Sequence, residues 1–224
     1  MKIARVLIAD DHEVVRHGIR TIVQTRPEFE ICGEASDGRQ AVQEAARLKP
    51  DIVVIDIGMP QLNGLDATRQ IVRNEPKVKV LVLTMHESEQ VMRDVLATGA
   101  RGYLLKTDAG RDLIAALEAL AGQKTFFTSK VAEIVLETCL KGRPDHGPSK
   151  TVLTSREREV VQLLAEGKST KEVAAVLGLS VKTAETHRSN LMRKLDMHSV
   201  GELVLYAVRN NLVQVIQPPS SDRR

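Results

Sequence analysis

The chain has 224 residues, 42 % of them hydrophobic and 27 % charged, a length that allows two domains with cores of their own. No apolar run approaches the roughly 20 residues that a membrane-spanning helix needs, and the N-terminal MKIARVLIADD turns acidic where a secretory signal stays apolar, which predicts a soluble, cytoplasmic protein without a membrane partner. The cysteines Cys32 and Cys139 match no zinc or disulfide pattern, so we interpret both as small buried hydrophobic residues.

The formal net charge of +3 is unevenly distributed along the chain. Residues 1–150 hold 21 Lys and Arg against 21 Asp and Glu, whereas residues 151–224 hold 11 against 8, so the second segment carries the whole excess of 3. A positive excess confined to one segment is a weak indication of an anionic partner there.

The first half of the chain alternates short aliphatic runs with amphipathic segments. The aliphatic runs predict strands at 4–10, 29–35, 51–56, 79–84 and 102–105. The segments between them have apolar residues at helical spacing and predict helices at 13–25, 38–48, 64–74, 88–98 and 110–121. Strands that alternate with helices of this length form βαβ units, so residues 1–122 predict an α/β domain with a doubly wound, five-stranded parallel sheet.

Residues 123–150 predict a connection between two domains. VAEIVLETCL (131–140) has the apolar spacing of one more amphipathic helix. KGRPDHGPSK (141–150) follows with two Pro, two Gly and no apolar side chain, a composition that is typical of an interdomain linker. At the far end of the chain, QPPSSDRR (217–224) predicts a disordered tail.

Residues 151–216 carry four helix-start signals at short intervals. Thr154, Ser169 and Ser199 are each followed three residues later by a Glu, which is the pattern of a capping box. Ser180 is a fourth candidate for an N-cap. Four short helices predict a small all-α domain.

Polar residues stand where four of the predicted strands end: Asp10 and Asp11, Asp56, Thr84, and Lys106. The carboxyl ends of parallel strands meet at one edge of a doubly wound sheet, so these side chains are expected to come together there. Adjacent carboxylates repel one another unless a cation neutralises them, and Mg²⁺ suits carboxylates, waters and a phosphate oxygen. With a Thr hydroxyl and a Lys ammonium opposite, the cluster predicts a site that holds a phosphoryl group on Asp56.

Each of these residues has a simpler structural explanation when it is taken alone. An Asp after a strand is most often a turn or N-cap residue, Thr84 can cap the next helix, and Lys106 can be a solvated lysine. Their joint occurrence favours the phosphoryl site.

In the motifs ADD (9–11), DIGMP (56–60), Thr84 and GYLLK (102–106), the first domain resembles the receiver domain of two-component response regulators, whose sheet is flavodoxin-like. The resemblance implies that a sensor histidine kinase phosphorylates Asp56 and that Thr84 and Lys106 bind the phosphoryl oxygens. It also implies a Mg²⁺ site, whose ligands are Asp10, Asp11, Asp56 and the Gly58 backbone carbonyl.

Two residues need separate comment in this resemblance. Tyr103 stands where the family has its aromatic switch, although a tyrosine at the edge of the core is the alternative. Gly58 replaces the polar side chain that is often found two residues after the acceptor, so local control of dephosphorylation is left open.

The segment SVKTAETHRSNLMRKL (180–195) predicts a helix with an apolar face and a polar face. Its apolar stripe consists of Val181, Ala184, Leu191 and Leu195. The preceding helix is stopped by Gly178, and a tight turn follows. This order is typical of a helix-turn-helix, whose second helix enters the major groove of DNA.

A polar face alone is found on any surface helix, but two further features favour DNA. Residues 182–194 carry four cations against the single acid Glu185. The pattern LTSREREVVQLLAEGKSTKEVAAVLGLSVKTAETHRSNLMRKL resembles the LuxR-type helix-turn-helix domain over nearly its full length. Joined to a receiver, it looks like a response regulator of the NarL/FixJ type.

By this resemblance, Glu185, Thr186 and Ser189 face base edges. The residues that are expected near phosphates are Lys182, Thr183, His187, Arg188 and Arg193. Two alternatives stay open: Glu185 can pair with Arg188 one turn on, and His187 can be half-buried packing. In the family, the helix near 199–210 also tends to form the dimer, although its apolar residues also fit a core helix.

We therefore predict a transcriptional regulator that binds double-stranded promoter DNA through the helix around 181–195, as a homodimer at least when Asp56 is phosphorylated. Its only catalysis is its own phosphoryl transfer and hydrolysis. An enzymatic rival is a phosphohydrolase of the haloacid dehalogenase type, but such enzymes carry a second Asp where Gly58 stands. A binding protein with a vestigial receiver is the third class.

Overall fold

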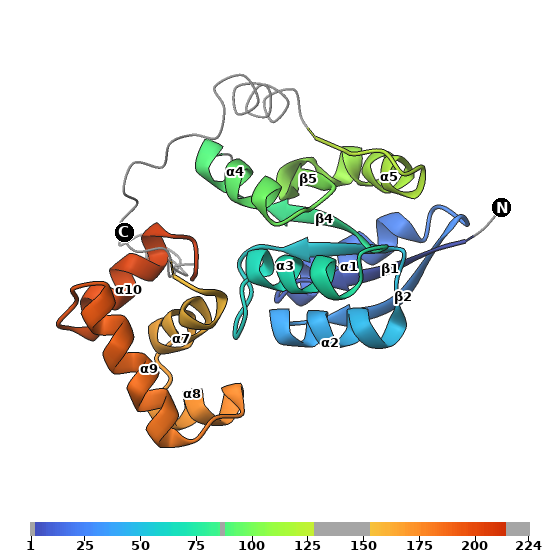
Figure 1. Ribbon diagram of the computed structural model, residues 1–224. Helices are drawn as coiled ribbons and strands as arrows, with labels where there is room; N and C mark the ends of the chain where they lie inside the picture. The colour runs from blue at the N-terminus through green and yellow to red at the C-terminus, as the bar shows by residue number, and fades with distance from the viewer. Residues whose placement is uncertain (1–2, 86–87, 128–152, 214–224) are drawn as a thin grey trace, which may run out of the picture. The chain divides into compact units, whose positions relative to one another are not determined.

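The computed structural model describes residues 3–85, 88–127 and 153–213 (Figure 1). The chain divides into two compact units, Met1–Ser149 and Lys150–Arg224, and each is described by itself. The predicted helix at 131–140, the linker at 141–150, the tail at 217–224 and Cys139 lie outside the described residues. Within those residues, no helix has the length and apolar character needed to span a membrane.

A five-stranded parallel sheet forms the centre of the first unit, with the strand order β2-β1-β3-β4-β5. Its strands are β1 (Ala4–Ala9), β2 (Phe29–Ala35), β3 (Ile52–Asp56), β4 (Lys79–Thr84) and β5 (Gly102–Leu105). The predicted sheet is confirmed, with strand ends that differ by at most one residue. The strand order reverses between β1 and β3, which is where a doubly wound sheet opens a crevice at its carboxyl edge.

Helices cover both faces of this sheet (Figure 1). They are α1 (Glu13–Val23), α2 (Gly38–Leu48), α3 (Gly64–Asn74), α4 (Glu89–Ala97) and α5 (Ala109–Ala121), and a short 3-10 turn, η1 (Lys106–Asp108), precedes α5. One core cluster joins the sheet to α2, α3 and α4, and a second joins it to α1 and α5. Because both faces are buried, the central strand β3 is a continuous aliphatic run up to Asp56, whereas the edge strand β2 also carries Glu30 and Glu34.

Four helices form the described part of the second unit: α7 (Ser155–Ala165), α8 (Thr170–Leu177), α9 (Val181–Lys194) and α10 (Val200–Arg209). Thr154 with Glu157 and Ser169 with Glu172 form the two reciprocal capping boxes that the sequence predicts, and Ser180 accepts from the Thr183 N–H. Gly178 ends α8 in the left-handed region at φ 63°, which a glycine adopts without steric cost.

Three details of the sequence interpretation are wrong. Ser199 caps α10, but the Glu202 carboxylate accepts from the N–H of His198, one residue before the cap, so the third capping box is incomplete. Val181 is 43 % exposed because it occupies the first position of α9, where the small core does not reach. Cys32 is only half-buried, and its thiol donates to the Val6 carbonyl at 3.4 Å.

We expect Gly38→Ala to destabilise the first unit. A Cβ at Gly38 would lie 1.9 Å from the Leu62 carbonyl oxygen, so the backbone has to shift. The free energy of unfolding, measured by urea denaturation with circular dichroism, should fall by about 1–3 kcal/mol. The matched control is Gly18→Ala, inside α1 with no atom within 4 Å of the added Cβ, which should gain about 0.5–1 kcal/mol. Equal effects of the two substitutions would contradict the packing argument.

Candidate functional site

The carboxylates that follow β1 and β3 converge at the carboxyl edge of the sheet. Asp56 is the last residue of β3 and Asp10 follows β1, so the pairing of these two strands makes the two residues neighbours. Asp10 is fully buried and Asp56 is 2 % exposed, whereas the Asp11 side chain is 29 % exposed. One ligand atom from each of Asp10, Asp11, His12 and Asp56 lies within 4.8 Å of the other three. The predicted acidic cluster therefore forms, and His12 joins it.

Lys106 reaches this cluster from the far side of the sheet edge. It begins η1 directly after β5, and its ammonium lies 2.7 Å from Asp10 Oδ2 and 3.1 Å from Asp56 Oδ2. One ammonium leaves the three carboxylates with an excess of negative charge. The Asp56 Oδ1 oxygen is buried and has no hydrogen-bond partner among the described residues. The cluster thus fits a further cation, for which carboxylate oxygens are suitable ligands.

Asp56 and Lys106 each affect the pKa of the other. Burial raises the pKa of the Asp56 carboxyl; the Lys106 ammonium opposes this increase, and the Asp10 carboxylate adds to it. Burial by itself would lower the pKa of Lys106, but the two carboxylates outweigh it and raise that pKa above its ordinary value. Lys106 is therefore a permanent cation, and Asp56 is a carboxylate whose negative charge is poorly compensated.

The other residues predicted for this site come from the neighbouring strands and from the loop after β3. Thr84 ends β4 and is fully buried, one position beyond the Leu83 that pairs with Asp56. Tyr103 lies within β5, is 1 % exposed and belongs to the core cluster beneath α4. Gly58 is half-buried in the bend after β3. Thr84 therefore ends the strand next to the one that ends at Asp56, while Tyr103 lies one strand further out, on β5.

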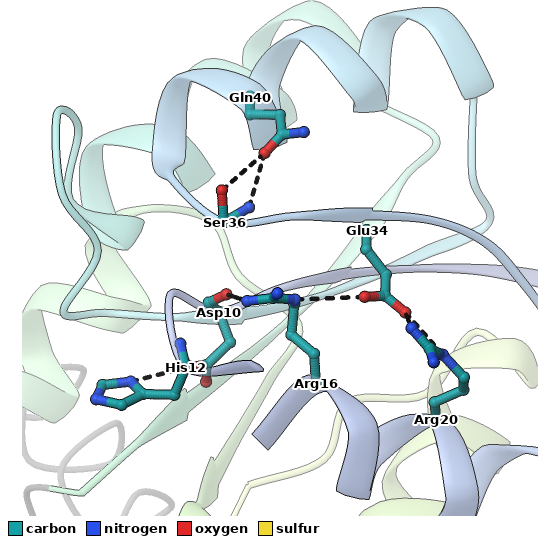
Figure 2. A network of polar contacts seen from close by, with 7 residues as sticks. All are labelled: Asp10, His12, Arg16, Arg20, Glu34, Ser36 and Gln40. Carbon is teal, nitrogen blue, oxygen red and sulfur yellow. Dashed lines mark hydrogen bonds and ion pairs between the residues drawn. The ribbon is translucent and has the colours of Figure 1, made fainter. Parts of the chain in front are cut away.

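A second polar network holds Asp10 from the side of α1 and β2 (Figure 2). Arg16 donates from Nη1 to the Asp10 backbone carbonyl at 2.7 Å and from Nε to Glu34 Oε2 at 3.3 Å. Arg20 pairs with the same Glu34 carboxylate. The His12 backbone N–H donates to Asp10 Oδ1 at 2.9 Å. Sequence reasoning missed this network, because nothing in the pattern links α1 to a glutamate 18 residues further along the chain.

The polar face of α9 is the second candidate surface. The predicted DNA-contacting residues that are exposed are Lys182, Thr183, Glu185, Thr186, Ser189 and Arg193, while His187 and Arg188 are half-buried. A surface depression of about 500 Å³ lies on this helix and is lined by Ser180, Lys182, Thr183, Thr186, His187 and Asn190. Ser180 and Asn190 were not among the predicted contacts.

Two of the four cations on α9 are engaged inside the unit. Arg188 donates from Nη1 to Thr170 Oγ1 at 3.2 Å, at the start of α8, so the alternative in which it pairs with Glu185 does not occur in the described chain. Lys194 lies 2.7 Å from Glu157 Oε2 on α7. Arg193 donates from Nη2 to Asn190 Oδ1 on its own helix at 3.0 Å. Of the four cations on α9, Lys182 and Arg193 are exposed, whereas Arg188 and Lys194 are half-buried.

Comparison with known proteins assigns each of the two units to a protein family. The profile of the response regulator receiver domain matches residues 6–118, and that of the bacterial regulatory proteins of the luxR family matches residues 151–207. The chain is 38 % identical over 209 residues to the transcriptional regulatory protein LiaR of Bacillus subtilis (strain 168), which covers 93 % of this chain and 99 % of LiaR. It is 37 % identical over 215 residues to the oxygen regulatory protein NreC of Staphylococcus carnosus (strain TM300), with the same coverage of 93 % and 99 %.

Among solved structures, RcsB from Salmonella enterica serovar Typhimurium, bound to the promoter rprA in the presence of the phosphomimetic BeF3⁻, is similar with a TM-score of 0.57 and 28 % identity. The similarity covers 91 % of this chain and 97 % of the RcsB chain. A second RcsB structure, from Salmonella typhimurium, gives a TM-score of 0.62 at 27 % identity and covers 94 % of this chain.

The raised pKa of Asp56 leads to a prediction about stability. An acid whose pKa is higher in the folded than in the unfolded protein destabilises the fold when ionised, and stability is regained as the pH falls through the folded pKa. In the presence of a chelator at pH 7, Asp56→Asn should therefore raise the free energy of unfolding, because the amide removes the buried negative charge that the fold compensates poorly. This gain should shrink as the pH is lowered, because wild-type Asp56 then becomes neutral. Urea titrations across the acidic range measure it.

Asp66→Asn is the control for this experiment. Asp66 is as buried as Asp56, but its carboxylate is paired with Arg69 at 2.8 Å and accepts from Asn63 Nδ2 at 3.0 Å. Its neutralisation should lower the free energy of unfolding at pH 7. A loss of stability in Asp56→Asn as well would show that Lys106 compensates the buried charge fully.

Proposed function

The chain belongs to the NarL/FixJ-type response regulators, which join a receiver domain to a LuxR-type DNA-binding domain, and on this basis we propose that phosphorylation of Asp56 with Mg²⁺ controls how the α9 surface binds promoter DNA. The observation that carries the proposal is the buried Asp56 carboxylate, which keeps one oxygen unpaired beside Asp10, Asp11 and Lys106. The phosphoryl donor is a sensor histidine kinase, as the receiver implies.

In this mechanism Asp56 acts as the nucleophile. Its unpaired Oδ1 attacks the phosphorus of the donor phosphohistidine, the P–N bond breaks, and an acyl phosphate forms on Asp56. Asp10, Asp11, Asp56 and the Gly58 carbonyl would hold Mg²⁺, which neutralises negative charge on the phosphoryl oxygens. Lys106 carries a fixed positive charge next to the reacting carboxylate, and the buried Thr84 ends the neighbouring strand with a hydroxyl. These two groups contact the phosphoryl oxygens after transfer.

The switch connects this site to the rest of the receiver. A phosphoryl group adds negative charge at Asp56 and attracts the Thr84 hydroxyl, and the space that Thr84 leaves changes the packing of Tyr103 in β5. Tyr103 starts from the buried position, where it is 1 % exposed. A change on this side of the receiver alters which surfaces associate, and the phosphorylated chain forms a homodimer.

The DNA-binding part of the proposal uses the exposed face of α9. RcsB, a structural neighbour, has been solved on promoter DNA, which supports the same use of this unit here. Glu185, Thr186 and Ser189 face the base edges. Lys182, Thr183, His187 and Arg193 lie near phosphates, whereas Arg188 contributes by fixing α9 against Thr170.

The proposed limits of the parts are 1–122 for the receiver, 123–150 for a helix and linker, 151–216 for the DNA-binding domain and 217–224 for the tail. The protein acts in the cytoplasm, where both the kinase domain and DNA are accessible. Catalysis is confined to its own phosphorylation and dephosphorylation, and Gly58, in place of a second acid, disfavours a general phosphohydrolase.

Phosphorylation can be tested without the kinase. Wild-type protein incubated with Mg²⁺ and acetyl phosphate should acquire one phosphoryl group by intact mass, and Asp56→Asn should acquire none. Asp112→Asn, which removes an acid from the surface of α5, is the control and should be phosphorylated like the wild type. Failure of the folded wild-type protein to react would favour a vestigial receiver.

DNA binding can be tested with a duplex of arbitrary sequence at several salt concentrations. Arg193→Ala should weaken binding and reduce the slope of log affinity against log salt by about 0.9, the contribution of one neutralised phosphate. Lys194→Ala removes the same charge from the next residue, but this ammonium is paired with Glu157, so the slope should not change. A wild-type affinity that is independent of salt would refute binding to the phosphate backbone.

A further inference from the structure

His12 brings a nitrogen ligand to the carboxylate cluster. Its Nδ1 lies 2.8 Å from Asp11 Oδ1 and 3.3 Å from Asp10 Oδ1. The residue occupies the N-cap position of α1, but its side chain makes no capping hydrogen bond. The side chain is 61 % exposed, and Figure 2 shows the imidazole beside Asp10.

The Lys106 ammonium and the His12 imidazole contact different oxygen atoms of the acids. Lys106 contacts the Oδ2 atoms of Asp10 and Asp56, whereas His12 approaches the Oδ1 atoms of Asp10 and Asp11. Asp56 Oδ1 is buried and has no hydrogen-bond partner in the described part of the chain. One ligand atom from each of the three acids and from His12 lies within 4.8 Å of the others, close to the roughly 4.2 Å that separates two ligands across one ion at about 2.1 Å from each.

The mixed chemistry of these ligands affects which ion they bind. Carboxylate oxygens alone suit Mg²⁺, while an imidazole nitrogen suits Co²⁺, Ni²⁺ and Zn²⁺ and is a poor ligand for Mg²⁺. A site with three carboxylates and one imidazole therefore favours these transition ions more strongly than the carboxylates would by themselves.

We propose that His12 is a direct ligand for transition-metal ions at the Asp10, Asp11 and Asp56 site, so that the receiver binds Co²⁺ or Zn²⁺ through an additional bond that Mg²⁺ does not use. The inference rests on the metal site of the proposed function and adds a residue that determines which metal binds there. In the competing explanation, His12 only donates a hydrogen bond to Asp11 and so orients a carboxylate that serves every metal alike.

Metal titrations distinguish the two explanations. Full-length wild type and His12→Ala are titrated separately with MgCl₂ and CoCl₂ by calorimetry in a buffer that does not bind metal. For His12→Ala we expect a Co²⁺ dissociation constant at least about 10-fold higher, comparable to the loss of a metal-site partner, and a Mg²⁺ dissociation constant within about twofold of wild type. The visible absorption bands of bound Co²⁺, which report its ligands, should shift in the same variant.

Two variants act as controls. His17→Ala removes an exposed histidine from the same helix and should leave both dissociation constants unchanged. Asp11→Asn replaces a charged carboxylate ligand with a neutral amide and should weaken the binding of both ions, which would show that Co²⁺ binds at this cluster. Equal changes for Mg²⁺ and Co²⁺ in His12→Ala, no change for either, or an unchanged Co²⁺ spectrum would overturn the proposal.

The experiments also distinguish failure of the proposed function from failure of the proposal about His12. Without Mg²⁺ binding or phosphoryl transfer in the wild type, the function proposed for Asp56 is refuted, while the Co²⁺ titration of His12→Ala still reports whether His12 is a ligand. Normal phosphorylation with Mg²⁺ together with an unaltered Co²⁺ affinity in His12→Ala refutes the further inference alone.

Discussion

The contacts of Lys106 with the carboxylates of Asp10 and Asp56 are the interaction on which the first unit depends. Burying a carboxylate is costly unless a charge or hydrogen bonds compensate it, and here one ammonium faces two fully or nearly fully buried acids, with Asp11 beside them. The incomplete compensation raises the pKa of Asp56 and leaves one of its oxygens unpaired. The same deficit of positive charge that weakens the fold makes the site able to accept a cation and a phosphoryl group.

The rest of the receiver holds this uncompensated cluster in place. Asp10 is fixed by Arg16 at its backbone carbonyl, by the His12 N–H at Oδ1 and by Lys106 at Oδ2. Glu34 in turn holds both Arg16 and Arg20, so β2 and α1 are joined beside the site. Apolar contacts cover both faces of the sheet, and the buried carboxylates of Asp10 and Asp56 lie at its carboxyl edge. Rigidity around Asp10 and an unpaired oxygen on Asp56 suit a reaction that depends on positioning.

In the DNA-binding unit, some charged side chains support the fold and others face outward. Lys194 pairs with Glu157 and Arg188 donates to Thr170, and these contacts fix α9 against α7 and α8. Lys182 and Arg193 keep their charges exposed. A recognition helix needs paired charges as well as exposed ones. The paired charges hold the helix at a fixed angle, and the exposed charges present donors to an anionic partner.

The sequence by itself determined the strands and helices, the acidic cluster and the helix-turn-helix, because these depend on local patterns: aliphatic runs, capping residues such as Thr154 and Ser169, and polar residues at strand ends. Tertiary structure alone decided which atoms meet. The pairing of β1 with β3 places Asp10 beside Asp56, the length of the Lys106 side chain carries its ammonium across β4, and the approach of α1 to β2 brings Arg16 to Glu34. Contacts between distant residues leave no periodic signal, so the engagement of Arg188 with Thr170 followed only from the folded chain.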